Sequence, residues 1–154
     1  MLSSHTMKKL LMGIVCVVTF SQCNNKIYSI DNLPKQYIEI GSFGGIVGLS
    51  KTYYLFSNGQ RFMKQSVMGA SSPEDTNEIA KIEPKDFKNI CKSLKEMKFT
   101  ELDLNEKGNM NYFIKYKTQK IDKHVQWSNM DTAPEGLVSL YRDILKNINT
   151  APIN

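Results

Sequence analysis

The sequence contains few of the residues that carry enzyme or metal chemistry. Of three cysteines and two histidines among 154 residues, Cys16, Cys23 and His5 fall in the N-terminal segment, so Cys91 and His124 stand alone in the rest of the chain. A single cysteine forms no internal disulfide, which excludes a disulfide-stapled miniprotein. One histidine and one cysteine are too few for a zinc motif. We therefore expect no metal and no cofactor.

Recognisable catalytic and nucleotide-binding motifs are lacking as well. No Gly-x-Ser-x-Gly nucleophile motif occurs. The glycine-rich stretch 41–48 leads into another strand pattern and is not closed by a Lys-Ser/Thr pair, which argues against a phosphate-binding loop. The segment 103–108 begins like a calcium loop, but Lys107 and Ile114 occupy positions that need ligands. These absences predict a protein that is not an enzyme.

The charge of the chain is mildly basic. The formal net charge is +5, and it is +3 without Lys8 and Lys9. Lysines are spread along the chain and the arginines are Arg61 and Arg142, whereas nucleic-acid binding uses a clustered basic face. Hydrophobic residues make up 41% and charged residues 23%. Length and composition predict one globular domain, a monomer without nucleic acid as a partner.

The N-terminal segment has the pattern of an export signal. Met7-Lys8-Lys9 is a basic region, and the apolar run 10–20 that follows is too short to span a membrane comfortably. This pattern predicts a signal peptide over residues 1–22, with Met7 as the true start of translation. Two alternatives to a lipoprotein signal stay open: an ordinary secretory signal, and an N-terminal anchor that is not cleaved.

Cys23 stands where a lipoprotein is acylated. Phe20-Ser21-Gln22-Cys23 resembles a lipobox, although Phe20 and Gln22 replace the usual Leu and small residue, and a polar stretch follows directly. Acyl chains on Cys23 add about 0.8 kcal/mol of membrane affinity per buried methylene. We expect Cys23 to be the lipid-attachment site, residues 23–36 to be a lipidated tether, and the cell envelope, with the outer membrane before the inner, to be the location.

Residues 37–150 are expected to form a single α+β domain. Alternating or β-rich patterns predict strands over 37–40, 51–56, 61–66, 112–116 and 121–127. The last four form two hairpins, the first closed by Asn58-Gly59 as a type I′ turn. The polar stretch 69–77 is predicted to be the most mobile loop. The class is a four- to five-stranded antiparallel sheet.

Two amphipathic helices complete the expected fold. One begins at Pro84 and the other at Pro134, and each has an apolar stripe at three- and four-residue spacing that packs on the same face of the sheet. Cys91 lies on the first stripe, which predicts a core residue rather than a reactive thiolate, since burial raises a thiol pKa. His124 alternates with Val125 and Trp127, which are expected to point inward, so its ring is predicted on the outer face.

The glycine-rich bend provides the candidate binding surface. Phe43, Gly44 and Gly45 could bring backbone groups and one aromatic ring close to a partner, whereas the competing interpretation is a strand bulge.

Two resemblances follow from this arrangement of motifs. The glycine bend 43–48, the Asn58-Gly59 hairpin, the helix 87–99 and the stretch 124–127 before the last helix resemble a family of small uncharacterised bacterial lipoproteins. Over residues 37–148 the order of elements is also distantly similar to emfourin, a protein inhibitor of thermolysin-like metallopeptidases. The resemblance implies an inhibitor of a peptidase and carries over no individual site residue. The chain departs from emfourin in its anchor and in the insertion 68–77.

The function predicted from the sequence is that of a membrane-anchored, non-enzymatic envelope lipoprotein. Its N-terminal lipid attaches it to the membrane, and its domain binds an envelope protein, with a peptidase as one candidate. Two alternatives stay open. One is a cell-envelope hydrolase that uses carboxylates such as Asp103, Glu106 and Asp122, and the other is a structural envelope subunit.

Overall fold

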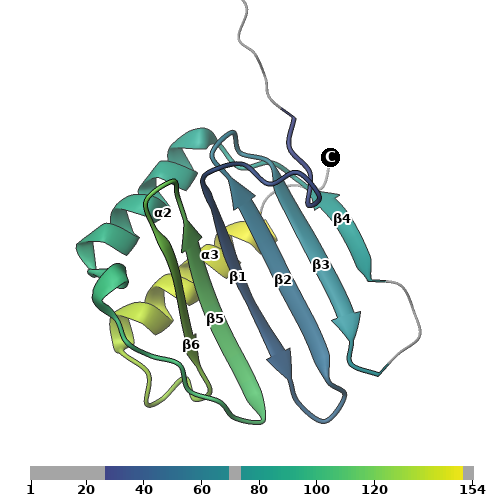
Figure 1. Ribbon diagram of the computed structural model, residues 1–154, viewed down its shortest axis with the longest axis vertical. Helices are drawn as coiled ribbons and strands as arrows, with labels where there is room; N and C mark the ends of the chain where they lie inside the picture. The colour runs from purple at the N-terminus through teal and green to yellow at the C-terminus, as the bar shows by residue number, and fades with distance from the viewer. Residues whose placement is uncertain (1–26, 70–73, 151–154) are drawn as a thin grey trace, which may run out of the picture.

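The protein forms one antiparallel sheet with two α-helices on one of its faces (Figure 1). The structure is a computed structural model that describes residues 27–69 and 74–150; the expected signal peptide and Cys23 lie outside these residues. The sheet order is β4-β3-β2-β1-β5-β6. Its strands are β1 Tyr37–Gly44, β2 Leu49–Phe56, β3 Arg61–Val67, β4 Asp75–Ile79, β5 Met110–Lys117 and β6 Asp122–Trp127.

The helices are those that the apolar stripes predict. Helix α2 spans Pro84–Glu96 with proline in its first turn, and α3 spans Glu135–Thr150 directly after Pro134. A short 3₁₀ helix, η1, covers Phe99–Glu101. Ile114, Val125 and Trp127 are fully buried beneath the helices, as expected. Among the described residues, no helix has the length and apolar character needed to cross a membrane.

Strand β4 makes the sheet larger than the four to five strands predicted. It occupies Asp75–Ile79, inside and just after the stretch predicted as a mobile loop, and it pairs with β3 from Arg61↔Ile79 to Gln65↔Asp75. The strand lies at the sheet edge and four of its five residues are exposed. Because neither face of β4 is buried, its sequence has no alternation of apolar and polar residues by which a strand could be recognised.

The β2–β3 hairpin is confirmed, but its turn is not type I′. Gly59 has a φ of 86°, while Asn58 has no positive φ. The Gly59 N–H donates to Phe56 O and the Phe56 N–H donates to Gln60 O, each at 3.0 Å. This pattern is a three-residue loop ending in a left-handed glycine. Asn58 stays right-handed because its Oδ1 accepts the Gln60 N–H at 3.0 Å.

Replacing Gly59 by alanine is expected to lower the free energy of unfolding by more than about 2 kcal/mol. The positive φ disfavours any side chain, and a Cβ at this position would lie 2.2 Å from the carbonyl oxygen of Ile82. Urea unfolding measures the loss. Gly136→Ala is the matched control, because Gly136 lies in α3 with nothing within 4 Å of a Cβ, so this variant should be unchanged or more stable. Equal stability of the two variants would contradict the explanation.

The segment before β1 lies against the sheet from Tyr28 onward. The Tyr28 ring packs edge-on against Phe56 at 5.8 Å, and Phe56 contacts Phe62 at 5.5 Å. The Tyr28 N–H donates to Oε1 of the buried Gln60 at 3.0 Å. Tyr28 and Ile30, which were expected as part of a tether, therefore pack against a small second core of Tyr37, Phe56 and Phe62 on the face of the sheet opposite the helices.

Arg61 is buried and caps α3. Its side chain is 1% exposed, and its Nε donates to the carbonyl oxygen of Ala80. One of its terminal nitrogens lies 3.5 Å from Asn147 O and 3.4 Å from Ile148 O, in the last turn of α3. Burial lowers the pKa of the guanidinium. The negative end of the α3 dipole lies against this charge, and no ion pair of Arg61 with a carboxylate is found among the described residues.

Candidate binding surface

The open face of the sheet, opposite the helices, holds a row of polar and aromatic side chains. Cross-strand register places Glu39, Lys115 and His124 side by side on β1, β5 and β6, and Gly41 beside Phe113 in the next row. Phe113 contacts both Phe43 (ring centroids 6.2 Å apart) and His124 (5.5 Å). All of these residues except Gly41 line a shallow depression of about 640 Å³. Its polarity is that of the solvated face of an antiparallel sheet.

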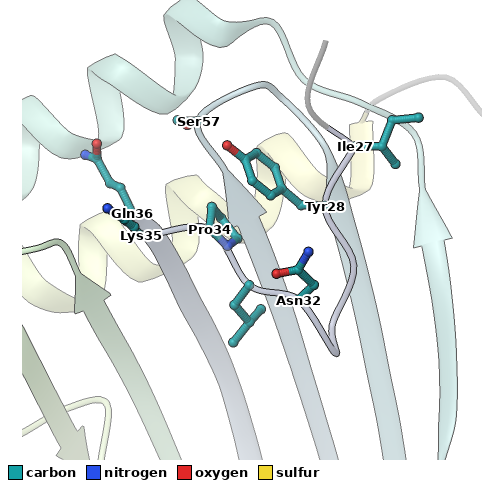
Figure 2. Close-up of a pocket in the computed structure, with 8 residues that line it drawn as sticks. Ile27, Tyr28, Asn32, Pro34, Lys35, Gln36 and Ser57 are labelled. Carbon is teal, nitrogen blue, oxygen red and sulfur yellow. The ribbon is translucent and has the colours of Figure 1, made fainter. Parts of the chain in front are cut away.

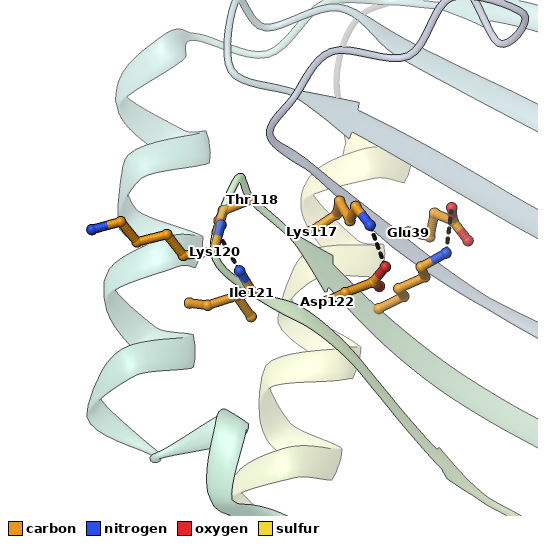
Figure 3. A network of polar contacts seen from close by, with 7 residues as sticks. Glu39, Lys117, Thr118, Lys120, Ile121 and Asp122 are labelled. Atoms are coloured by element: carbon orange, nitrogen blue, oxygen red, sulfur yellow. Dashed lines mark hydrogen bonds and ion pairs between the residues drawn. The ribbon is translucent and has the colours of Figure 1, made fainter.

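Ion pairs tie the charges of this face together. Glu39 lies 3.8 Å from the Lys115 ammonium, and Lys117 pairs with Asp122 at the hairpin end (Figure 3). Burial raises the pKa of Glu39, and this effect outweighs the opposing effect of Lys115. The pKa of Asp122 is lowered, chiefly by its hydrogen bond from Lys117. Each of these two carboxylates thus has a lysine partner, and Asp122 is near enough to Glu39 for its negative charge to contribute to the raised pKa of Glu39.

His124 lies on the outer face of β6, as predicted, and it should titrate below its ordinary range. Partial desolvation lowers its pKa, and the positive charge of Lys115 lowers it further. The depressed pKa means that the folded state binds its proton less readily than the unfolded state, so stability should fall as the pH drops below the ordinary value of 6.5. An NMR titration reads this pKa directly, because His124 is the single histidine after residue 5. Lys115→Gln should raise it, and an unchanged pKa would contradict the assignment.

The three carboxylates that a hydrolase function would use, Asp103, Glu106 and Asp122, do not lie together in the structure. Asp122 lies at the start of β6 beside Lys117, whereas Glu106 and Asp103 flank the bridge between Asn105 and Gln126 at its other end. Within residues 27–69 and 74–150, no cluster of three or more His, Cys, Asp or Glu side chains could hold a metal.

Cys91 is half-buried rather than fully buried. It packs at the margin of the core, where Nε2 of Gln36 lies 3.7 Å from its Sγ. Burial raises the thiol pKa, as the position on the apolar stripe of α2 predicted. A thiol with a raised pKa is protonated at neutral pH and is a poor nucleophile.

The predicted glycines serve internal packing at the turn between β1 and β2. Gly44 has a φ of 110°, and a Cβ there would lie 2.2 Å from Asn109 O. The Gly45 N–H, which could have faced a partner, donates to that same oxygen at 2.7 Å. Phe43 points to the open face and contacts Phe113. The three residues of the candidate surface are therefore split between the turn and the open face.

The residues that follow these glycines form the most exposed apolar cluster in the described part of the chain. Ile46 is fully exposed, and Val47 and Met68 are 73% and 77% exposed. Leu49 and Val67, which are partners in the β2–β3 register, complete it. We call these five residues the apolar tip. It lies at the end of the sheet opposite the point where the chain enters (Figure 1).

The backbone of the apolar tip is held by hydrogen bonds on both sides. Besides the Gly45 bond to the β5 side, the Gly48 N–H donates to Gly45 O at 3.0 Å and the Met68 N–H donates to Gly48 O at 2.9 Å. A turn fixed in this way presents its side chains at little entropic cost on binding. The apolar tip is therefore the candidate binding surface of the described residues.

Comparison with known proteins does not assign this surface. No protein-family model matches the sequence, and a search of curated proteins gives no significant match. The sequence predicted a candidate surface at Phe43, Gly44 and Gly45 and did not single out Ile46 and Val47, because two consecutive β-branched residues are typical of a buried strand. Their positions directly after two glycines were the signal that a tight turn would expose them.

Proposed function

We propose that the protein is a lipid-anchored, non-enzymatic binding domain of the bacterial cell envelope that engages a protein partner through the apolar tip. The observation that carries this proposal is the exposure of Ile46, Val47 and Met68 on an ordered turn at the end remote from the N-terminal anchor. An apolar cluster of this kind is costly to leave in water and is stabilised by burial in a partner, at about 25 cal/mol per Å².

A protein with a concave apolar cleft fits the tip better than a flat surface does. The tip is a convex turn, and two of its three most exposed side chains, Ile46 and Val47, are consecutive and aliphatic. A peptidase is the partner class that the emfourin resemblance suggests, since a substrate cleft is a concave site of this type. Titration of a thermolysin-like peptidase with the protein tests this class directly: stoichiometric inhibition would support it, and full activity at saturating protein would remove it.

The partner proposal is tested by photo-crosslinking in the native host. A photoreactive amino acid is placed at Val47 or at Met68 in the tip, and at the exposed Lys92 on helix α2 as the control site. We expect the same partner band from both tip positions and none from Lys92, and the purified partner should bind the isolated protein. Crosslinks to a second copy, to lipid, or equally from all three sites would contradict the proposal.

The anchor is tested independently of the partner. Mass spectrometry of the mature N-terminus should show an acylated Cys23. Cys23→Ser should abolish the modification, and globomycin, an inhibitor of signal peptidase II, should leave the signal peptide uncleaved. An unmodified N-terminus from wild-type cells would remove the anchor while leaving the binding role of the tip to be decided by the crosslinks.

A further inference from the structure

Exposed aliphatic and basic side chains meet at the end of the domain where the chain enters. Ile27 is 83% exposed and Leu33 is 36% exposed, and both line a depression of about 580 Å³ together with Lys35 (Figure 2). Lys35 also lines an adjoining depression of about 350 Å³ with Lys117 and Lys120 of the β5–β6 turn. We call these five residues the entry surface, since Lys35 joins its two halves.

The entry surface carries an excess of positive charge. Asp122 pairs with Lys117 and neutralises it. In the described part of the chain, Lys35 and Lys120 have no ion-pair partner and both are exposed. The β5–β6 turn is fixed by Thr118, whose Oγ1 accepts the N–H groups of Lys120 and Ile121 at 3.1 and 2.9 Å. The Lys120 side chain projects outward from this turn (Figure 3). The two free ammonium groups thus stand on an ordered part of the surface.

We propose that the entry surface rests on the anionic headgroups of the membrane that holds the anchor. Aliphatic side chains of such a surface enter the boundary between headgroups and acyl chains, while lysines beside them extend to lipid phosphates. The proposal rests on the anchoring half of the proposed function, because Cys23 stands four residues before Ile27. The contact turns the opposite end of the sheet, and with it the apolar tip, away from the bilayer (Figure 1).

Vesicle binding of the unlipidated protein tests the contact apart from the acyl chains. The protein is the mature chain from residue 23 with Cys23→Ser, which retains the whole described fold. It is sedimented with phosphatidylcholine vesicles with and without 30% phosphatidylglycerol, at low salt. We expect binding to the anionic vesicles alone. The double variant Lys35→Gln/Lys120→Gln should bind about 25-fold more weakly, or about fivefold per lysine, which corresponds to about 1 kcal/mol each.

Matched variants separate a local contact from a general effect of net charge. Lys98→Gln/Lys107→Gln removes the same charge from residues outside both depressions and should bind within about twofold of the parent protein. Lys35→Arg/Lys120→Arg should keep full binding. No binding to anionic vesicles, equal binding to both vesicle types, or equal losses in the two glutamine variants would overturn the proposal. Loss of vesicle binding in Ile46→Ser/Val47→Ser would overturn it too, by placing the membrane at the tip. The crosslinks from the apolar tip and the mass of the N-terminus are measured separately, so the vesicle result does not decide the proposed function.

Discussion

The double substitution Ile46→Ser/Val47→Ser is expected to weaken partner binding by more than 100-fold without changing the stability of the fold. Both side chains are largely or fully exposed, so their removal breaks no contact in the folded domain. In the complex, each buried aliphatic side chain contributes about 1.5–3 kcal/mol, and the loss of two exceeds the 2.8 kcal/mol or so that corresponds to 100-fold in Kd. Calorimetric titration with the crosslinked partner measures the effect.

Two further variants make this result specific to the tip. Ile46→Leu/Val47→Ile preserves apolar surface and should retain affinity within about tenfold. Ile27→Ser/Leu33→Ser removes two exposed aliphatic side chains from the other end of the sheet and should leave partner affinity unchanged. The proposed role of the tip would be wrong if both serine variants lost affinity equally, or if Ile46→Ser/Val47→Ser bound as the parent does.

Arg61→Ala is expected to lower the free energy of unfolding by about 3 kcal/mol. The substitution empties a space in the interior and leaves the carbonyl oxygen of Ala80 and the last turn of α3 without their donor. It therefore combines a cavity with buried unsatisfied acceptors. Urea unfolding followed by far-UV circular dichroism measures the loss, because both α3 and the sheet report on it.

Arg142, the other arginine of the sequence, provides the control for this substitution. Arg142 is exposed on α3, so Arg142→Ala should change stability by less than about 0.5 kcal/mol. Arg61→Met should recover part of the loss, because it refills the space and removes the buried charge but supplies no donor. A loss in Arg61→Ala no larger than that in Arg142→Ala would show that the cap does not stabilise the fold.

The sequence predicted the elements whose patterns are created by one-sided burial. Both helices and the β2–β3 and β5–β6 hairpins have one face in the core, so their apolar residues recur with the period of the element. Strand β4 was not predicted because it is exposed on both faces. The predicted type of the Asn58 turn was wrong because a side-chain hydrogen bond outweighed the Asn-Gly preference. Each of these misses comes from a contact or an exposure that no local pattern records.

The sequence predicted the candidate surface at Phe43, Gly44 and Gly45, and the structure separates these residues between the turn and the open face. Gly44 is required by the close approach of Asn109, whereas Gly45 has a positive φ of 75° and donates its N–H to Asn109 O. The exposure of Ile46 and Val47 was not predicted, because two consecutive β-branched residues are also typical of a buried strand. The basic half of the entry surface was hidden for a different reason, since Lys35 and Lys120 lie 85 positions apart in the chain.

The packing of Tyr28 on Phe56 limits how far the domain could move from the proposed anchor at Cys23. If residues 23–36 were all free, an extended chain would let the domain move about 48 Å from an acylated Cys23. With Tyr28 bound to the sheet, five residue steps separate Cys23 from the domain, and an extended chain of that length spans at most about 17 Å. On the proposal that Cys23 is acylated, the domain stays within this distance of its own bilayer, so its partner must be embedded in that layer or delivered to it.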